Sequence, residues 1–236
     1  MAIPATGVAY CVNPAVVLAH ALATLLDHNG RILVEDLLPP PASASVRAAL
    51  ADIELGRDSN APSIDLDWGA PGLTPAERVL AWNAIEVLAI KSGNPESPVN
   101  AIPPTARAHC QLRFVVGTDW RNVQEHLDAH FGRNGLKNVQ VTVEPGVAAT
   151  RLDLDDPWVE WTLASIRKTT GKKPALLPNL GGTVPNAIFA ETLGLPTVVD
   201  PAFLSGVFTA CAERTSSRFG RARVSGADGG DLVGPG

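Results

Sequence analysis

The sequence has few of the residues that would mark a secreted, membrane-bound or nucleic-acid-binding protein. It holds three cysteines in 236 residues, and their odd number and wide spacing predict a reducing cytoplasm rather than a disulfide framework. Lysine and arginine number 19 against 24 acidic residues, so no basic excess favours a nucleic-acid partner. No apolar run approaches the length of a membrane span, and the first residues lack the pattern of a secretion signal. We therefore expect a cytoplasmic protein with neither a nucleic-acid nor a membrane partner.

The composition predicts a globular chain. Hydrophobic residues make up 45% of the sequence and charged residues 18%, which is outside the range of disordered proteins. The length is enough for one large domain or two small ones with buried cores. Glycine and arginine dominate after Ser216, where the hydrophobic periodicity ends.

The residues up to 147 predict an α+β unit. Asn13 and Pro14 form an N-cap and a first helical residue, and an apolar helix follows to about Asp27. Strands are predicted at 84–92, 106–116 and 138–144, and an amphipathic helix at 120–131. The order helix, strand, strand, helix, strand is a split βαβ unit of the ferredoxin-like kind that lacks its first strand. The region before Asn13 should supply that strand.

The segment 36–83 reads as an irregular insertion in this unit. Residues 43–55 have helical spacing, and Thr74 with Glu77 forms the N-cap of a further short helix. After residue 147 the pattern changes, and a boundary falls near 147–152. Asp155, Asp156 and Pro157 begin a helix that runs to about Thr170. Strands at 174–177 and 195–199 and a helix at 184–193 then predict part of a larger α/β sheet.

Three motifs carry a resemblance to a known family. They are V-N-A-I-P-P-T-A-R-A at 99–108, Q-L-R-F-V-V-G at 111–117, and G-K-K-P with N-L-G-G-T-V-P-N-A-I-F between 171 and 189. In this order the chain resembles the co-catalytic zinc peptidases, which include carboxypeptidase G, acetylornithine deacetylase, succinyl-diaminopimelate desuccinylase, aminoacylase-1 and cytosolic dipeptidases. The resemblance implies a lid, or dimerisation, domain at 13–147 with the insertion at 36–83. It also implies a remnant of the catalytic α/β domain at 148–199.

The resemblance implies a set of substrate-binding residues: Asn100, Arg113, Gly181, Gly182 and Thr183. Asn100 matches a position at the interface between lid and active site, although an Asn beside Pro also commonly satisfies loop backbone. Arg113 lies in the middle of a predicted strand and could equally be a solvent-facing arginine. Backbone N–H groups of the Gly181 to Thr183 segment, before a helix, could hold a substrate carboxylate, although a Gly-Gly pair is usually only a turn.

The resemblance also implies what the chain is expected to lack. The family uses two zinc ions, and all but the last of their ligands lie upstream of the lid domain, at positions that this sequence does not contain. We therefore expect no catalytic residue, no metal ligand and no bound zinc, so that the chain is an inactive fragment of a peptidase or amidohydrolase. Two alternatives stay open: an active metallohydrolase of dipeptides or N-acyl amino acids, and a non-catalytic module that forms a homodimer through its lid domain.

Both ends of the sequence predict a change of reading frame. The family's last ligand should follow L-G-L-P-T-V, but the sequence continues V-D-P-A-F-L-S-G-V-F-T-A-C. Read one base later, the possible codons of 199–217 permit W-I-P-H-S-Y-P-G-C-S-Q-H-A-P-N-E-H, which is of the family's type. Residues 2–11 likewise permit H-S-G-N-W-G-G-L-L one base earlier. We expect residues 1–12 to be an out-of-frame start and 200–236 an out-of-frame, disordered tail.

Three other sets of reactive side chains have simpler interpretations. His126 and His130 are four residues apart on one helix face, which permits a metal pair but is more typical of a solvated polar face. The acidic residues at 153–156 fit the start of a helix. Cys110 has no neighbour in the sequence that would activate it as a nucleophile.

Overall fold

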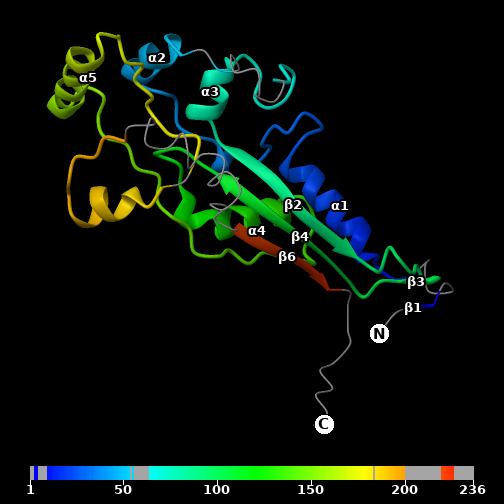
Figure 1. The fold of residues 1–236 in the computed structure, drawn as a ribbon. Coiled ribbons are helices and arrows are strands. Elements are labelled where there is room, and N and C mark those ends of the chain that lie inside the picture. Colours follow the sequence, from blue (N-terminus) through cyan, green and yellow to red (C-terminus); the bar gives the residue numbers. More distant parts are fainter. Residues whose placement is uncertain are drawn as a thin grey trace.

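The computed structural model describes residues 10–53, 55, 64–182 and 184–199, together with the backbone of residues 3–4 and 219–225. It forms one elongated body, with α2, α3 and α5 gathered at one end and the sheet with α1 and α4 toward the other (Figure 1). The elements in chain order are β1 (Ile3–Pro4), α1 (Pro14–Leu25), η2 (Glu35–Leu37), α2 (Ala44–Ala51), α3 (Pro75–Leu80), β2 (Ala84–Ser92), β3 (Ala101–Ile102), β4 (Thr105–Arg113), η3 (Trp120–Asn122), α4 (Val123–Arg133), β5 (Val139–Gln140), α5 (Pro157–Thr170), η4 (Ile188–Thr192) and β6 (Phe219–Ser225).

The predicted first helix is confirmed as α1. The side chain of Asn13 accepts a hydrogen bond from the backbone N–H of Ala15 at 3.0 Å, and Pro14 occupies the first turn, where its missing N–H costs nothing. The buried face of α1 carries Leu18, Ala21 and Leu25, spaced at three and four residues. This face fixes α1 against the sheet.

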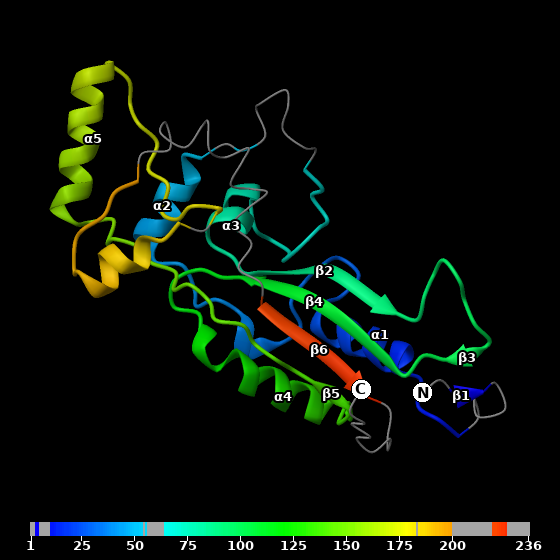
Figure 2. The ribbon, with the colours of Figure 1, turned by 60° about the horizontal axis from the view of Figure 1, so that its bottom comes forward.

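The main sheet has four antiparallel strands in the order β2-β4-β6-β5. Helices α1 and α4 cover one of its faces (Figures 1 and 2). The core between helices and sheet includes Val34, Leu37, Ala106, Ala108 and Phe131, each at most 3% exposed. The prediction of an α+β fold is confirmed.

Among the described residues before Asn13, none joins the main sheet as its missing strand. β1 instead pairs with β3 in a separate two-stranded sheet at the far end of the molecule from α5 (Figure 2). The place between β4 and β5 is filled by β6, whose residues the sequence predicts to lie in a disordered tail. Residues 10–12 are not a strand, and residues 5–9 lie outside the described residues.

The segment 36–83 contains regular structure and packs on the second half of the chain. The predicted capping box of α3 is confirmed, since Thr74 accepts from the Glu77 N–H and the Glu77 side chain accepts from the Thr74 N–H. Helices α2 and α3 bury Val46, Leu50, Ala76 and Leu80 together, and Leu154 and Leu177 pack against this cluster. The segment therefore links residues 36–83 with residues after 147.

The second half of the chain is less regular than the sequence predicts. Helix α5 is confirmed, with Asp156 as its N-cap and Gly171 as its C-cap at a φ of 70°, in the left-handed region that glycine enters without strain. Residues 174–177 and 195–199, however, are not strands, and the predicted helix at 184–193 is reduced to a short π-helical segment. A strand needs a neighbour for its backbone hydrogen bonds, and none pairs with these segments within the part of the chain that the structure describes. The described ranges contain no helix of the length and apolarity needed to cross a bilayer.

Candidate functional site

A large cleft lies between the sheet and the segments that follow residue 147. Its volume is about 1340 Å³. One wall comes from the adjoining ends of β2 and β4 and from Trp68 and Trp82. The other wall comes from residues 147–152, 174–182 and 197–199. A concave site of this size, apolar with a few polar groups, is the usual form of a small-molecule site.

The cleft brings together three of the five predicted substrate-binding residues. Arg113 is the last residue of β4, and its Nη1 donates to the carbonyl oxygen of Gly181 at 3.4 Å. Gly181 and Gly182 are exposed, and a Cβ on Gly181 would come to 3.0 Å from a methyl carbon of Val79. The close approach of this loop to α3 therefore favours glycine at 181. The guanidinium has five N–H donors, so it can hold this contact and still bind a carboxylate.

Two asparagines hold the glycine loop in place. The Nδ2 of Asn179 donates to the carbonyl of Leu80, the last residue of α3. The Nδ2 of Asn186 lies 2.8 Å from both the Thr150 and the Thr197 hydroxyl oxygens. These bonds join the loop to three separate segments, so the sequence motif around Asn186 serves to position the loop. The helix expected after the loop is too short to provide a macrodipole.

The other two predicted residues are not placed in this cleft. Asn100 is exposed and precedes β3, at the opposite end of β4 from Arg113. Since β4 has 9 residues, the two ends are roughly 25 Å apart. Thr183 lies outside the described residues.

Trp68, Arg78 and Asn83 also shape the cleft, and no sequence signal singled them out. The Arg78 guanidinium donates to the carbonyl oxygens of Asp65, Leu66 and Trp68, which orders the loop before α3. The Trp68 ring packs so closely on Gly30 that a Cβ there would lie 2.6 Å from it. These contacts join residues far apart in the sequence, and only the fold reveals them.

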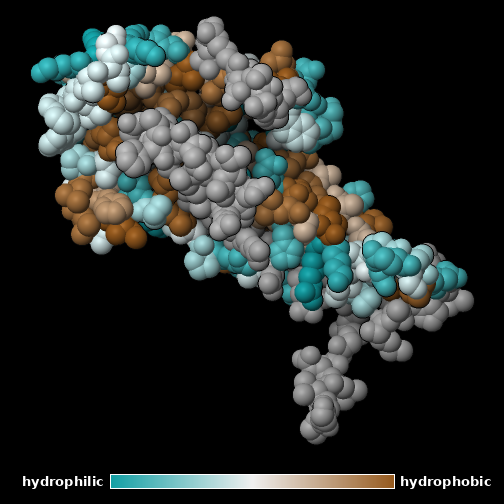
Figure 3. Space-filling view, in the orientation of Figure 1, coloured by the Kyte–Doolittle hydropathy of each residue, from teal (hydrophilic) through white to brown (hydrophobic). Residues whose placement is uncertain are grey.

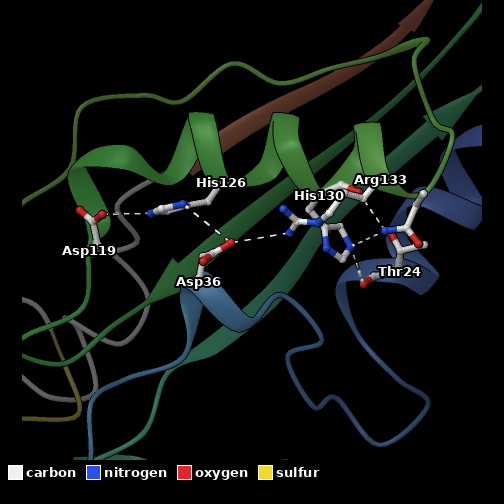
Figure 4. Close-up of polar contacts among 7 residues, drawn as sticks. Thr24, Asp36, Asp119, His126, His130 and Arg133 are labelled. Carbon is white, nitrogen blue, oxygen red and sulfur yellow. Dashed lines mark hydrogen bonds and ion pairs between the residues drawn. The ribbon is translucent and has the colours of Figure 1, made fainter.

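The two histidines of α4 turn to different partners (Figure 4). The Nε2 of His126 lies 3.0 Å from Asp119 Oδ2, and its Nδ1 lies 4.0 Å from Asp36 Oδ2. The hydrogen bond from the Asn122 side chain, followed by that from His126, lowers the pKa of the Asp119 carboxyl. His130 is 7% exposed, and its Nε2 donates to the carbonyl of Thr24 on α1 at 2.9 Å. The expectation of a solvated polar face is therefore wrong for His130, because α1 packs over it.

The described residues do not fit the two-zinc centre that the resemblance implies. Within the ranges given above, no three His, Cys, Asp or Glu side chains converge as a metal ion requires. In the group around His126, the two carboxylates occupy opposite nitrogens of one ring, so their oxygens do not converge on a single point beside it. Cys110 is partly buried, and this burial raises the pKa of its thiol to about 11, which disfavours the thiolate.

Comparison with known proteins assigns the sheet domain to a family. A family model described as the peptidase dimerisation domain matches residues 9–139, which is more than half of the chain. The chain belongs to the M20 peptidase dimerisation domain family. Over 103 residues the M20 chain is 35% identical to succinyl-diaminopimelate desuccinylase from Methylobacterium nodulans. The family model therefore makes it a member of a peptidase family.

Two solved structures share the fold of the M20 chain. An M20 family metallo-carboxypeptidase from Sulfolobus solfataricus is 20% identical with a TM-score of 0.62, over 82% of this chain and 45% of its own. A di-peptidase from Saccharomyces cerevisiae is 16% identical with a TM-score of 0.55, over 80% of this chain and 42% of its own. At these identities the likeness concerns the fold. The M20 chain covers 25% of the desuccinylase and less than half of either solved structure.

Proposed function

We propose that the chain is a dimerisation module that also carries one wall of a substrate site for dipeptides or N-acyl amino acids. The observation that carries the proposal is the meeting of Arg113 with the Gly181–Gly182 loop at the cleft, on a chain of the M20 dimerisation family. Both substrate classes carry a carboxylate beside the amide bond. An arginine at the mouth of a largely apolar cleft is suited to bind that group in a bidentate manner.

The chain's own residues bind and orient the substrate. Arg113 pairs with the carboxylate, and the exposed backbone of Gly181 and Gly182, which Arg113 contacts at the Gly181 carbonyl, offers N–H groups to the same end of the ligand. Apolar parts of the ligand are held by the cleft wall that Trp68 and Trp82 form. In the family, two zinc ions supply the activated water. Because the donor set of the described residues does not fit that centre, we infer that this polypeptide alone binds substrate without cleaving it.

The edge of the sheet supports homodimer formation. β2 is an outer strand, and its exposed residues include Val87, Leu88 and Ile90, at 38%, 48% and 61%. Apolar side chains gather over this strand in the space-filling view (Figure 3). A long apolar edge strand in a monomer invites pairing with another chain. We propose that a second copy covers it in the cytoplasm.

Substrate binding is tested by calorimetric titration of the full chain with a dipeptide and with an N-succinyl amino acid. Arg113→Ala should weaken binding at least tenfold, since a charge-assisted pair contributes about 1.5–3 kcal/mol. Arg107→Ala is the matched control, because Arg107 is an exposed arginine on the same strand outside the cleft. Equal affinity of the Arg113→Ala variant and the unchanged chain would remove the substrate role of the cleft.

Hydrolysis and assembly need separate measurements. Metal analysis of the purified chain should find no stoichiometric zinc, and added zinc should produce no hydrolysis of either substrate. Two zinc ions per chain with chelator-sensitive hydrolysis would establish the active metallohydrolase instead. In sedimentation, Ile90→Glu should shift a dimer to monomer, whereas Val99→Glu, at a 72% exposed loop position, should not. A dimer that survives Ile90→Glu would exclude β2 as the interface.

A further inference from the structure

The dimerisation domain leaves one position in its sheet without a strand of its own. β4 and β5 are joined through α4, and both run antiparallel to β6, so they run parallel to each other. They are not direct neighbours, because the order of the sheet is β2-β4-β6-β5. The residues from α1 to β5 therefore contribute three strands, with a gap between the second and the third. A strand that fills this gap must run antiparallel to both neighbours.

Residues 219–225 fill the gap from outside the domain. The register of β6 runs from Thr105 opposite Ser225 to Cys110 opposite Phe219, and on the other side Val139 and Gln140 lie opposite Val224 and Arg223. Figure 2 shows β6 between β4 and β5. α1 also packs along β6. In the described residues β5 has no other partner, so β6 joins it to the rest of the sheet.

We propose that the gap between β4 and β5 is a binding site for an extended peptide, and that residues 219–225 of the same chain are its occupant. They act as a donor strand that completes the dimerisation domain. With the gap empty, the free edge of β4 and the short β5 would expose unpaired N–H and C=O groups, which is the condition for strand addition. This inference is independent of the substrate proposed for the cleft.

The sequence of the donor strand alternates as a strand between β4 and β5 requires. In F-G-R-A-R-V-S, the small residues Ala222 and Val224 have Ala108 and Ala106 as register partners, and both of these alanines are fully buried. The register therefore sets small residues of β6 opposite small, buried residues of β4. On the alternate positions, the register sets Arg223 opposite Arg107, and Arg107 opposite Lys91. Three basic residues thus form one row across the sheet.

This row provides a test, because like charges directly opposite each other destabilise a sheet. In the full chain, R107E and R223E should each raise the melting temperature by about 1–3 °C. The double variant R107E/R223E restores like charges and should melt below the sum of the two effects. R167E, on α5 away from the sheet, should combine additively with R223E. Additive effects of R107E and R223E would overturn the proposed register.

A disulfide distinguishes a donor strand of the same chain from that of a second copy. Thr105 and Ser225 are register partners, and the Cα separation of such pairs, about 4.5–5.5 Å, suits a disulfide. In a chain whose native cysteines are replaced by serine, T105C/S225C should oxidise to a link within one chain on non-reducing electrophoresis. The control T105C/S43C should not link. A link only between two chains, or none, would overturn the proposal.

Discussion

Asn83 is a buried polar residue whose side chain joins three segments of the domain. It is 3% exposed, and its Nδ2 donates to the Leu37 carbonyl at 2.8 Å and to the Thr118 hydroxyl at 2.9 Å. Its Oδ1 accepts from the Val115 N–H at 2.9 Å. One side chain thereby joins η2, the start of β2 and the loop after β4.

We expect Asn83→Ala to lower the free energy of unfolding by about 2–4 kcal/mol. Each of three hydrogen bonds contributes about 0.5–1.5 kcal/mol, and the Leu37 carbonyl and the Val115 N–H would be left without their partner. For a domain whose stability is about 5–15 kcal/mol, this is a large fraction. With a urea m-value near 2 kcal/mol/M, the midpoint should fall by about 1–2 M.

The assay is equilibrium urea unfolding followed by tryptophan fluorescence. Asn94→Ala is the matched control, because the Asn94 side chain only accepts a 3.3 Å bond from Glu96 in an exposed turn. It should change the stability by less than about 0.5 kcal/mol. Thr118→Val should lose part of the same free energy and be non-additive with Asn83→Ala. An Asn83→Ala midpoint equal to that of the control would refute the role assigned to this hydrogen-bond group.

Three further predictions concern single groups. Thr74→Ala should cost about 0.5–2 kcal/mol in urea unfolding, because it removes the N-cap of α3; an unchanged midpoint would contradict the capping box. Burial raises the pKa of Cys110 to about 11, so its contribution to folding stability is present below about pH 9 and is lost as the pH rises toward 11. The free energy of unfolding of Cys110→Ala should therefore fall less between about pH 9 and pH 11. The Asn122 side chain and His126 lower the pKa of Asp119, so the contribution of Asp119 to folding stability is present above about pH 4 and is lost on further acidification. The melting temperature of Asp119→Asn should therefore depend less on acid pH. An unchanged pH profile would exclude the contact.

The sequence predicted those helices that begin at a recognisable N-cap residue and the strand whose composition is typical of a sheet. The N-caps Asn13, Thr74 and Asp156 begin helices where expected, and the strand predicted at 84–92 is β2 with the same bounds. The motifs singled out Arg113 and Gly181 separately, but neither their contact nor the cleft that contains them followed from the sequence.

Features that depend on distant partners could not be predicted in this way. The apolar runs at 174–177 and 195–199 have strand composition, but a strand forms only where another strand offers its backbone groups. Conversely, 219–225 contains one glycine and two arginines and has no clear strand pattern in the sequence. It becomes a strand because the edges of β4 and β5 both offer it backbone hydrogen-bonding groups. Asn83 illustrates the same point for side chains, since its partners lie 32 to 46 residues away.

The packing of α2 and α3 on residues after 147 has a kinetic consequence for the cleft. Leu154 and Leu177 pack on the cluster of Leu50 and Leu80, so separation of the two cleft walls exposes this apolar surface to water. We therefore expect this packing, on helices within the dimerisation domain, to slow the opening of the cleft and the exchange of a bound ligand. We expect the removal of methyl groups from the buried side chains of α2 and α3 to shorten the residence time of a ligand, although none of these side chains lines the cleft.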